Sequence, residues 1–90
     1  MHWNKELTYW ITPKSGPMRG METLIDANHA LSQDLTKFYL KRPHWIEAGK
    51  LVVQAAETGS DEDVQLATDE LLRAIEIEGW MTHGRVARTG

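Results

Sequence analysis

The titratable side chains are the first candidates for chemistry in this sequence. The four histidines are His2, His29, His44 and His83. No two of them lie four residues apart, the spacing that places two imidazoles on one helix face to bind a metal. Asp26 and His29 lie three apart, with Glu22 just before them, so these side chains could meet as a metal site or a carboxylate–imidazole pair. A solvated helix face with a local hydrogen bond explains the same spacing, and we favour that interpretation.

Three further groups of residues lack the partners that their chemistry would need. The acidic run 61–63 has neither the alternating Asp/Asn pattern nor the closing Glu of a calcium loop, and its place after Ser60 suits the start of a helix. Gly16 and Gly20 are not followed by the Lys-Ser/Thr of a phosphate loop. None of the serines stands in a nucleophile-elbow context. The sequence therefore predicts no enzyme, no metal ligand and no bound cofactor.

The charge distribution argues against a nucleic-acid partner. Residues 1–50 hold seven Lys/Arg against five Asp/Glu, whereas residues 51–90 hold three against eight. A helix beginning near Ser60 could be the second helix of a helix-turn-helix, but so acidic a helix would be repelled by phosphate. The only basic cluster is Lys37, Lys41, Arg42 and His44. We interpret it as a solvated helix end, and whether it binds anything stays open.

The aromatic residues give the best clue to a contact surface. In a strand over residues 6–12, Leu7, Tyr9 and Ile11 share one face, and Trp10 lies on the other. If the first face covers helices, Trp10 is exposed unless a second subunit or Trp80 covers it. Exposed apolar patches often mark association sites, and Trp and Tyr are favoured anchors. We therefore expect Tyr9, Trp10 and Trp80 to form the interface, with burial of Trp10 inside the monomer as an equal alternative.

These residues would be positioned by a hairpin followed by three helices. The strand over 6–12 ends at Pro13, a turn spans 13–17, and residues 18–22 could return as a short second strand. A first helix starts after Thr23, which forms a capping box with Asp26. Its apolar stripe continues to Tyr39, and Pro43 ends it. The fold class predicted is α+β, a single domain over residues 1–81.

The second and third helices are marked by their ends. The second begins near His44, carries Gly49 inside it and ends at Gly59, the left-handed cap. We expect Leu51 and Val53 to broaden its buried face, and a neighbouring backbone to approach Gly49 closely. The third helix runs from the Ser60 cap, with Asp63 completing a capping box, to Gly79. Residues 80–81 continue in extended form against the hairpin, and residues 82–90 are expected to be a mobile tail.

Composition sets the class of protein. A chain of 90 residues that is 41% hydrophobic and 26% charged is typical of one small globular domain. The absence of cysteine excludes disulfides, thiol nucleophiles and Cys-based metal sites, so stability must come from an apolar core or a partner subunit. No apolar run is long enough to span a membrane, and the first residues lack the layout of a signal peptide. We therefore expect a cytoplasmic protein.

The order of these signals resembles a bacterial family known as domain of unknown function 982. The first shared marks are the Thr-x-x-Asp-Ala that opens the first helix at Thr23 and the proline that follows it, Pro43. The others are Gly59, the acidic opening before Ala67, and the closing Glu-Gly with two apolar residues at 78–81. The chain departs from the family at Arg42, where members often carry Trp, at Thr68, where they often carry Arg, and in lacking a Cys in the second helix. The resemblance implies a hairpin-and-helix fold and transfers no functional residue.

The sequence thus favours a non-enzymatic protein-association module, with a homodimer as one version. The alternative is a small-ligand or regulatory domain with a pocket between the hairpin and the helices. A metal or enzymatic role for Glu22, Asp26 and His29 is the third and weakest hypothesis.

Overall fold

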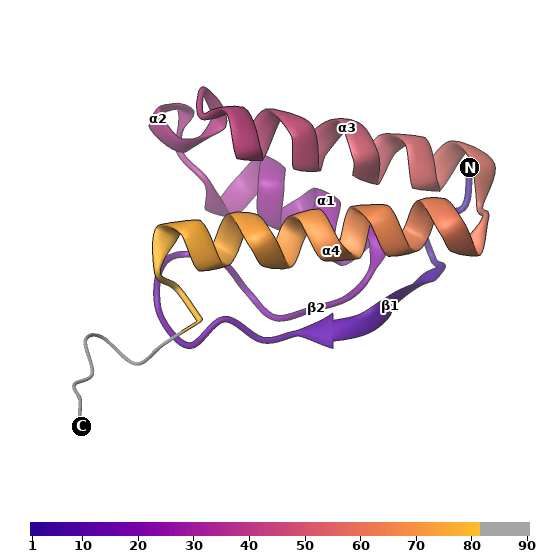
Figure 1. Cartoon of the computed structure of the whole chain (residues 1–90), viewed down its shortest axis with the longest axis horizontal. Coiled ribbons are helices and arrows are strands. Elements are labelled where there is room, and N and C mark those ends of the chain that lie inside the picture. Colours follow the sequence, from indigo (N-terminus) through magenta and orange to yellow (C-terminus); the bar gives the residue numbers. More distant parts are fainter. Residues whose placement is uncertain (82–90) are drawn as a thin grey trace.

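The computed structural model describes residues 1–81, in which seven elements follow one another (Figure 1). They are β1 (Glu6–Ile11), β2 (Met21–Thr23), α1 (Leu24–His29), a π-helical turn η1 (Ala30–Asp34), α2 (Lys37–Leu40), α3 (Pro43–Thr58) and α4 (Asp61–Glu78). The two strands form an antiparallel pair that precedes the helices, which confirms the α+β class. The prediction of three helices is wrong, because these residues contain four α-helices.

The hairpin has an irregular register. Glu6 lies opposite Thr23 and Ile11 opposite Met21, so β1 advances five residues while β2 advances two, and the excess bulges from the ladder. The strand predicted over residues 18–22 is shifted to Met21–Thr23. The backbone N–H of Arg19, which lies in the predicted strand, donates to Asp34 Oδ2 at 3.0 Å and so does not pair with β1.

The first predicted helix is broken after Asp34. Leu35 has extended backbone angles (φ −93°, ψ 136°), and a new short helix, α2, starts two residues later. Asp34 accepts hydrogen bonds from the Arg19 backbone N–H at 3.0 Å and from its guanidinium at 2.8 and 2.9 Å, while Leu35 turns into the core and is 5% exposed. The chain thus leaves the helical path, and Phe38, expected in the apolar stripe, is 64% exposed.

Helices α3 and α4 lie side by side and run in opposite directions (Figure 1). Pro43 occupies the first turn of α3, and Gly59 ends it at φ 68°, as predicted. Ser60 caps α4 by accepting from the Asp63 backbone N–H at 3.1 Å. The predicted capping box is incomplete, because the Asp63 carboxylate accepts the Thr58 hydroxyl instead, at 2.6 Å.

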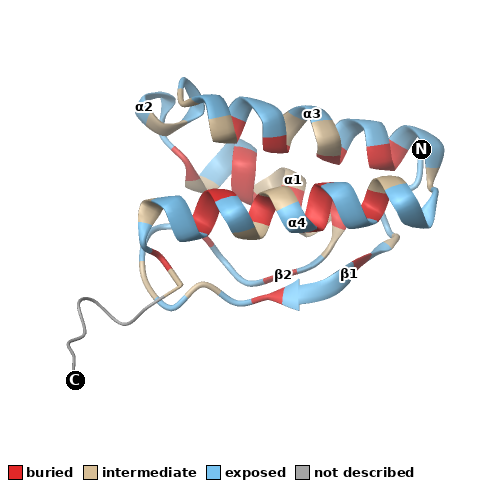
Figure 2. Cartoon of the chain, in the orientation of Figure 1, coloured by how far each residue is buried: buried red, intermediate tan, exposed pale blue. Residues whose placement is uncertain are grey.

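Small side chains let these two helices pack closely. Ala48 and Ala55 of α3, and Ala67 and Ala74 of α4, are 0% exposed, and residues without bulk at the contact bring helix axes together. The buried residues of both helices face inward (Figure 2). On one flank α4 packs against β1, and on the other against α3, while α1 contacts α3 from behind (Figure 1).

Two expectations for α3 are wrong. Val53 does not broaden the buried face, because it is 43% exposed. No described residue approaches Gly49, since a Cβ built there would meet nothing within 4 Å.

Within residues 1–81, no helix combines the length and the apolar character that crossing a membrane requires. The predicted tail, residues 82–90, lies outside the described residues.

Candidate functional site

Strand β1 carries two of the three predicted contact residues. Leu7 and Ile11 are 4% and 2% exposed, which confirms that they face the core. Trp10 remains 62% exposed and Tyr9 37% exposed. Within the described chain Trp10 is therefore open to solvent, a question that the sequence left undecided.

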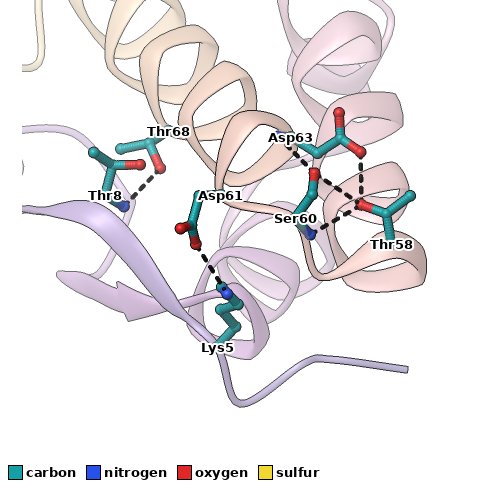
Figure 3. A network of polar contacts seen from close by, with 7 residues as sticks. All are labelled: Lys5, Thr8, Thr58, Ser60, Asp61, Asp63 and Thr68. Carbon is teal, nitrogen blue, oxygen red and sulfur yellow. Dashed lines mark hydrogen bonds and ion pairs between the residues drawn. The ribbon is translucent and has the colours of Figure 1, made fainter.

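A buried threonine fixes β1 to α4 (Figure 3). The backbone N–H of Thr8 donates to Thr68 Oγ1 at 3.1 Å, and the Thr68 hydroxyl donates in turn to the Val64 carbonyl at 2.7 Å. Thr68 is 0% exposed, so both of its hydrogen-bonding roles are satisfied inside the protein. Sequence reasoning missed this residue. The sequence feature that could have found Thr68 is a polar residue on the apolar face of this helix, one turn after Val64.

A second hydrogen bond to α4 holds Tyr9, the residue next to Trp10. The Tyr9 hydroxyl donates to Asp69 Oδ1 at 2.7 Å. Burial, the hydrogen bond to Asp69 and the negative charges of Asp69 and Glu76 together raise the pKa of Tyr9 to about 12. Tyr9 is thus a protonated donor at neutral pH, and Trp10 extends from a strand whose neighbouring residues are anchored.

Trp80 does not belong to this surface. It is 9% exposed, stacks on Trp45 with ring centroids 5.9 Å apart, and meets the Tyr39 ring edge-on at 5.0 Å. The expectation that Trp80 joins Tyr9 and Trp10 in one interface is therefore wrong, because Trp80 closes the end of the core instead.

The hairpin turn folds over Trp80, as predicted, although residues 79–81 form a turn and not an extended segment. The Trp80 carbonyl accepts from the backbone N–H groups of Lys14 and Ser15 at 2.8 and 3.1 Å. Gly16 adopts φ +80°, and a Cβ there would lie 2.5 Å from the Trp80 ring. Glycine at this position is therefore required by both the backbone angle and the contact.

Two members of the basic cluster converge on a partly buried carboxylate, that of Glu78. Glu78 Oε2 lies 2.9 Å from His44 Nε2, 2.9 Å from Trp45 Nε1 and 3.6 Å from Arg42 Nε. Burial raises the pKa of Glu78, but the hydrogen bonds from His44 and Trp45 and the charge of Arg42 outweigh it and hold this pKa below its ordinary value. The carboxylate thus joins the C-terminal end of α4 to the N-terminal end of α3, where an anion is favoured.

The basic cluster is therefore divided. Lys37 and Lys41 remain exposed, while Arg42 and His44 bind Glu78. A hollow of about 390 Å³ opens beside this pair between α3 and α4, and it is lined by Pro43, His44, Glu47, Glu70, Arg73 and Ile77. No serine, threonine or cysteine lines it that could act as a nucleophile.

The third predicted group is Glu22, Asp26 and His29, and its Asp26 carboxylate caps the start of α1. Asp26 Oδ2 accepts from the backbone N–H groups of Glu22 and Thr23 at 3.0 and 3.1 Å, and Thr23 Oγ1 accepts from the Asp26 N–H. These hydrogen bonds hold the pKa of Asp26 below its ordinary value. In the part of the chain that the structure describes, no three His, Cys, Asp or Glu residues are placed to hold a metal ion.

A hollow also lies between the hairpin and α4, where the alternative ligand pocket was expected. Its volume is about 340 Å³, and its lining is Lys5, Glu6, Leu7, Thr8, Asp61, Val64 and Gln65. Lys5 Nζ and Asp61 Oδ1 form an ion pair at 3.0 Å at this place (Figure 3). Five of the seven lining residues are polar or charged, whereas small-molecule sites are lined mainly by apolar groups.

The chain was compared with protein-family models, with curated proteins and with solved structures. None of them matched. The resemblance to domain of unknown function 982 therefore stays a prediction, and the site is interpreted from its own geometry.

Proposed function

We propose that this chain is a non-enzymatic protein-association module, and that it binds a protein partner through Trp10 on β1. The proposal rests on the indole ring of Trp10, which is 62% exposed on a strand that hydrogen bonds hold against α4. Tryptophan is among the residues that dominate binding energy at protein interfaces.

The anchoring of β1 supports this role. The Thr8 N–H is bound by Thr68 and the Tyr9 hydroxyl by Asp69, while Ile11 is 2% exposed. Because the backbone of β1 is already held, a partner that covers Trp10 has to order little beyond the side chain itself, and such preorganisation raises affinity. Trp10 is thus suited to fill an apolar pocket of another protein.

The small-ligand alternative has weaker support. The hollow between β1 and α4 is lined mostly by polar and charged residues, and the ion pair of Lys5 and Asp61 lies in it. In the group around Glu78, His44 and Trp45 are directed at one carboxylate oxygen, an arrangement that joins two helix ends. Association through Trp10 remains the function that the geometry supports best.

The experiment is a quantitative comparison of three baits in extract of the native cells. The baits are the unchanged chain, Trp10→Ser and the control Leu66→Ser, which removes another exposed apolar side chain (52%) from α4. We expect a protein that is retained by the unchanged chain and by the control and is lost with Trp10→Ser. Equal retention by all three baits, or no retained protein, contradicts the proposal.

A further inference from the structure

The short helix α2 and the residue that follows it present apolar and basic side chains together. Four side chains here are exposed, and we call them the α2 surface: Lys37, Phe38, Leu40 and Lys41. At about 100° per residue, all four fall within one half of the helical turn. Tyr39 falls on the other half and packs edge-on against Trp80, with ring centroids 5.0 Å apart. The turn is thus held to the core through Tyr39 and exposes its other side to solvent (Figure 2).

The positive charge of the α2 surface is not neutralised by the rest of the described chain. Neither Lys37 nor Lys41 forms an ion pair or a side-chain hydrogen bond with another of residues 1–81. The guanidinium carbon of Arg42 lies 5.0 Å from the centre of the Phe38 ring, so a third cation borders the exposed aromatic side chain. Phe38 itself is 64% exposed. The surface therefore combines apolar side chains with two lysines that are free to bind an anionic partner.

The acidic first turn of α4 lies at the opposite end of the helix pair. Because α3 and α4 run in opposite directions, α2 is beside the C-terminal end of α4 (Figure 1). Asp61 and Glu62 are exposed at the N-terminal end, and a helix of 18 residues is about 27 Å long. This exceeds the screening length of about 8–10 Å at physiological salt. An anionic surface can thus approach α2 without strong repulsion from that turn.

The carboxylates nearer to α2 are bound or lie on other parts of the surface. Three of them are paired with a cation or a hydrogen-bond donor of the chain: Asp34, Glu70 and Glu78. Glu47 lines the hollow between α3 and α4. Glu76 lies near Tyr9 of β1, where its charge helps to raise the pKa of that residue. These carboxylates therefore leave the charge of Lys37 and Lys41 available.

We propose that the α2 surface docks on an anionic lipid membrane. Phe38 and Leu40 would enter the interfacial layer, and the two lysines would lie against the phosphates and carboxylates of the headgroups. Aromatic and aliphatic side chains bordered by Lys and Arg are the combination that binds at this depth of a bilayer.

The shape of the α2 surface favours a membrane over a peptide. Helix α2 lies at the corner of the molecule where the chain turns into α3 (Figure 1). Neither of the two hollows described above is lined by any of residues 37–42, whereas a bound peptide needs a groove or a strand edge. A flat lipid surface accepts side chains that project from a corner.

Membrane docking is independent of the proposed protein partner. Figure 1 shows α2 and β1 on opposite sides of α4, so a chain that is bound through α2 keeps Trp10 free. Each lysine near an anionic membrane raises the affinity about fivefold, so a surface with two free lysines should bind weakly and reversibly.

Co-sedimentation of the full chain with lipid vesicles tests the inference. The vesicles contain equal amounts of phosphatidylserine and phosphatidylcholine, and vesicles of phosphatidylcholine alone are the control. We expect binding to the mixed vesicles only, and a decrease of this binding as the salt concentration rises, because salt screens the attraction. No binding to the mixed vesicles, or equal binding to both kinds, overturns the inference.

Two pairs of lysine substitutions locate the binding surface. The double variant Lys37→Gln with Lys41→Gln should lower the partition coefficient on mixed vesicles at least about tenfold. The matched control, Lys14→Gln with Lys50→Gln, removes two other exposed lysines and should change it much less. Equal losses from the two double variants would show that overall charge and not the α2 surface binds the membrane, and would overturn the inference.

The apolar residues distinguish a membrane from an acidic protein. Phe38→Ser should lower the partition coefficient about fivefold, because the ring no longer enters the interface, whereas Leu66→Ser on α4 should leave it unchanged. Poly-L-glutamate supplies the charge of an acidic protein without a lipid interface. Binding to poly-L-glutamate, combined with vesicle binding that does not depend on Phe38, would assign the α2 surface to an acidic protein segment and overturn the inference.

The orientation of the docked chain can be measured with a dye. Because the sequence contains no cysteine, Thr36→Cys and Gln65→Cys can each be labelled with a fluorophore that is sensitive to polarity. On mixed vesicles, the emission from position 36, at the start of α2, should shift to shorter wavelength, and the emission from position 65, on α4, should not. Equal shifts, or a shift at position 65 alone, would place another face on the membrane and overturn the inference.

Discussion

Replacing Glu78 by glutamine removes the charge that joins the ends of α3 and α4 while keeping the size of the side chain. Glu78 Oε2 is 2.9 Å from both His44 Nε2 and Trp45 Nε1, and the side chain is 9% exposed. Hydrogen bonds to a charged group contribute about 1.5–3 kcal/mol, against about 0.5–1.5 kcal/mol for neutral ones. Losing the charge from both bonds should lower the free energy of unfolding by about 2 kcal/mol at pH 7.

This loss should depend on pH in a defined direction. The pKa of Glu78 in the folded chain lies below its ordinary value of 4.5, so the carboxylate stabilises the fold fully above pH 4.5, and this contribution disappears as the pH falls through the folded pKa. Asp26, Asp34 and Asp63 also have lowered pKa values and are unchanged in the variant. The difference between the unchanged chain and Glu78→Gln therefore isolates the contribution of Glu78.

Urea unfolding followed by tryptophan fluorescence measures both quantities, because Trp45 and Trp80 are buried beside this group. We expect a gap of about 2 kcal/mol at pH 7 that closes as the pH falls well below 4.5. A variant as stable as the unchanged chain at pH 7 would show that the charge of Glu78 does not stabilise the fold. A gap that stays the same at low pH would contradict the prediction too, because it would show that shape and not charge carries the effect.

Two further substitutions test the packing of α4 and α3. Thr68→Val keeps the side-chain shape but leaves the Thr8 N–H without its acceptor, so it should lower the free energy of unfolding in urea by about 1–2 kcal/mol. The control Thr8→Val, whose side chain is exposed, should lower it by less than about 0.5 kcal/mol. Equal effects of the two variants would contradict the role of Thr68. Gly49→Ala should stabilise the chain by about 1 kcal/mol, because a Cβ at this position would meet nothing within 4 Å, and a destabilised variant would show that Gly49 is needed within the chain.

Features encoded by neighbouring residues could be predicted from the sequence. The Thr23 cap with Asp26, the Ser60 cap and the glycine ends at Gly59 and Gly79 are all found in the structure. Each depends on hydrogen bonds or backbone angles within one turn of the chain, so the pattern contains the whole interaction.

Features that depend on distant residues could not be predicted in this way. The helix break after Asp34 depends on Arg19, and the position of β1 depends on Thr68. The contact between the N-terminal end of α3 and the C-terminal end of α4 depends on Glu78, which lies 34 residues after His44. In each case the interaction involves a partner that lies far away in the sequence, so the pattern of one segment does not contain it.

The exposure of Trp10 lies between these cases. Strand alternation predicted its face, but only the packed structure shows that Trp80 is committed to the core and leaves Trp10 open. The predicted set of Tyr9, Trp10 and Trp80 is thereby reduced to the two residues of β1.

Binding of a protein partner at Trp10 can be measured by photo-crosslinking in the native cells, with p-benzoylphenylalanine placed at position 10 and, as the control, at position 66. Both residues are exposed, at 62% and 52%, but only Trp10 lies on the proposed binding surface. We expect a discrete product, of this chain joined to a different protein, from position 10 and none from position 66. Identical product patterns from the two positions, or no product from position 10, would contradict it.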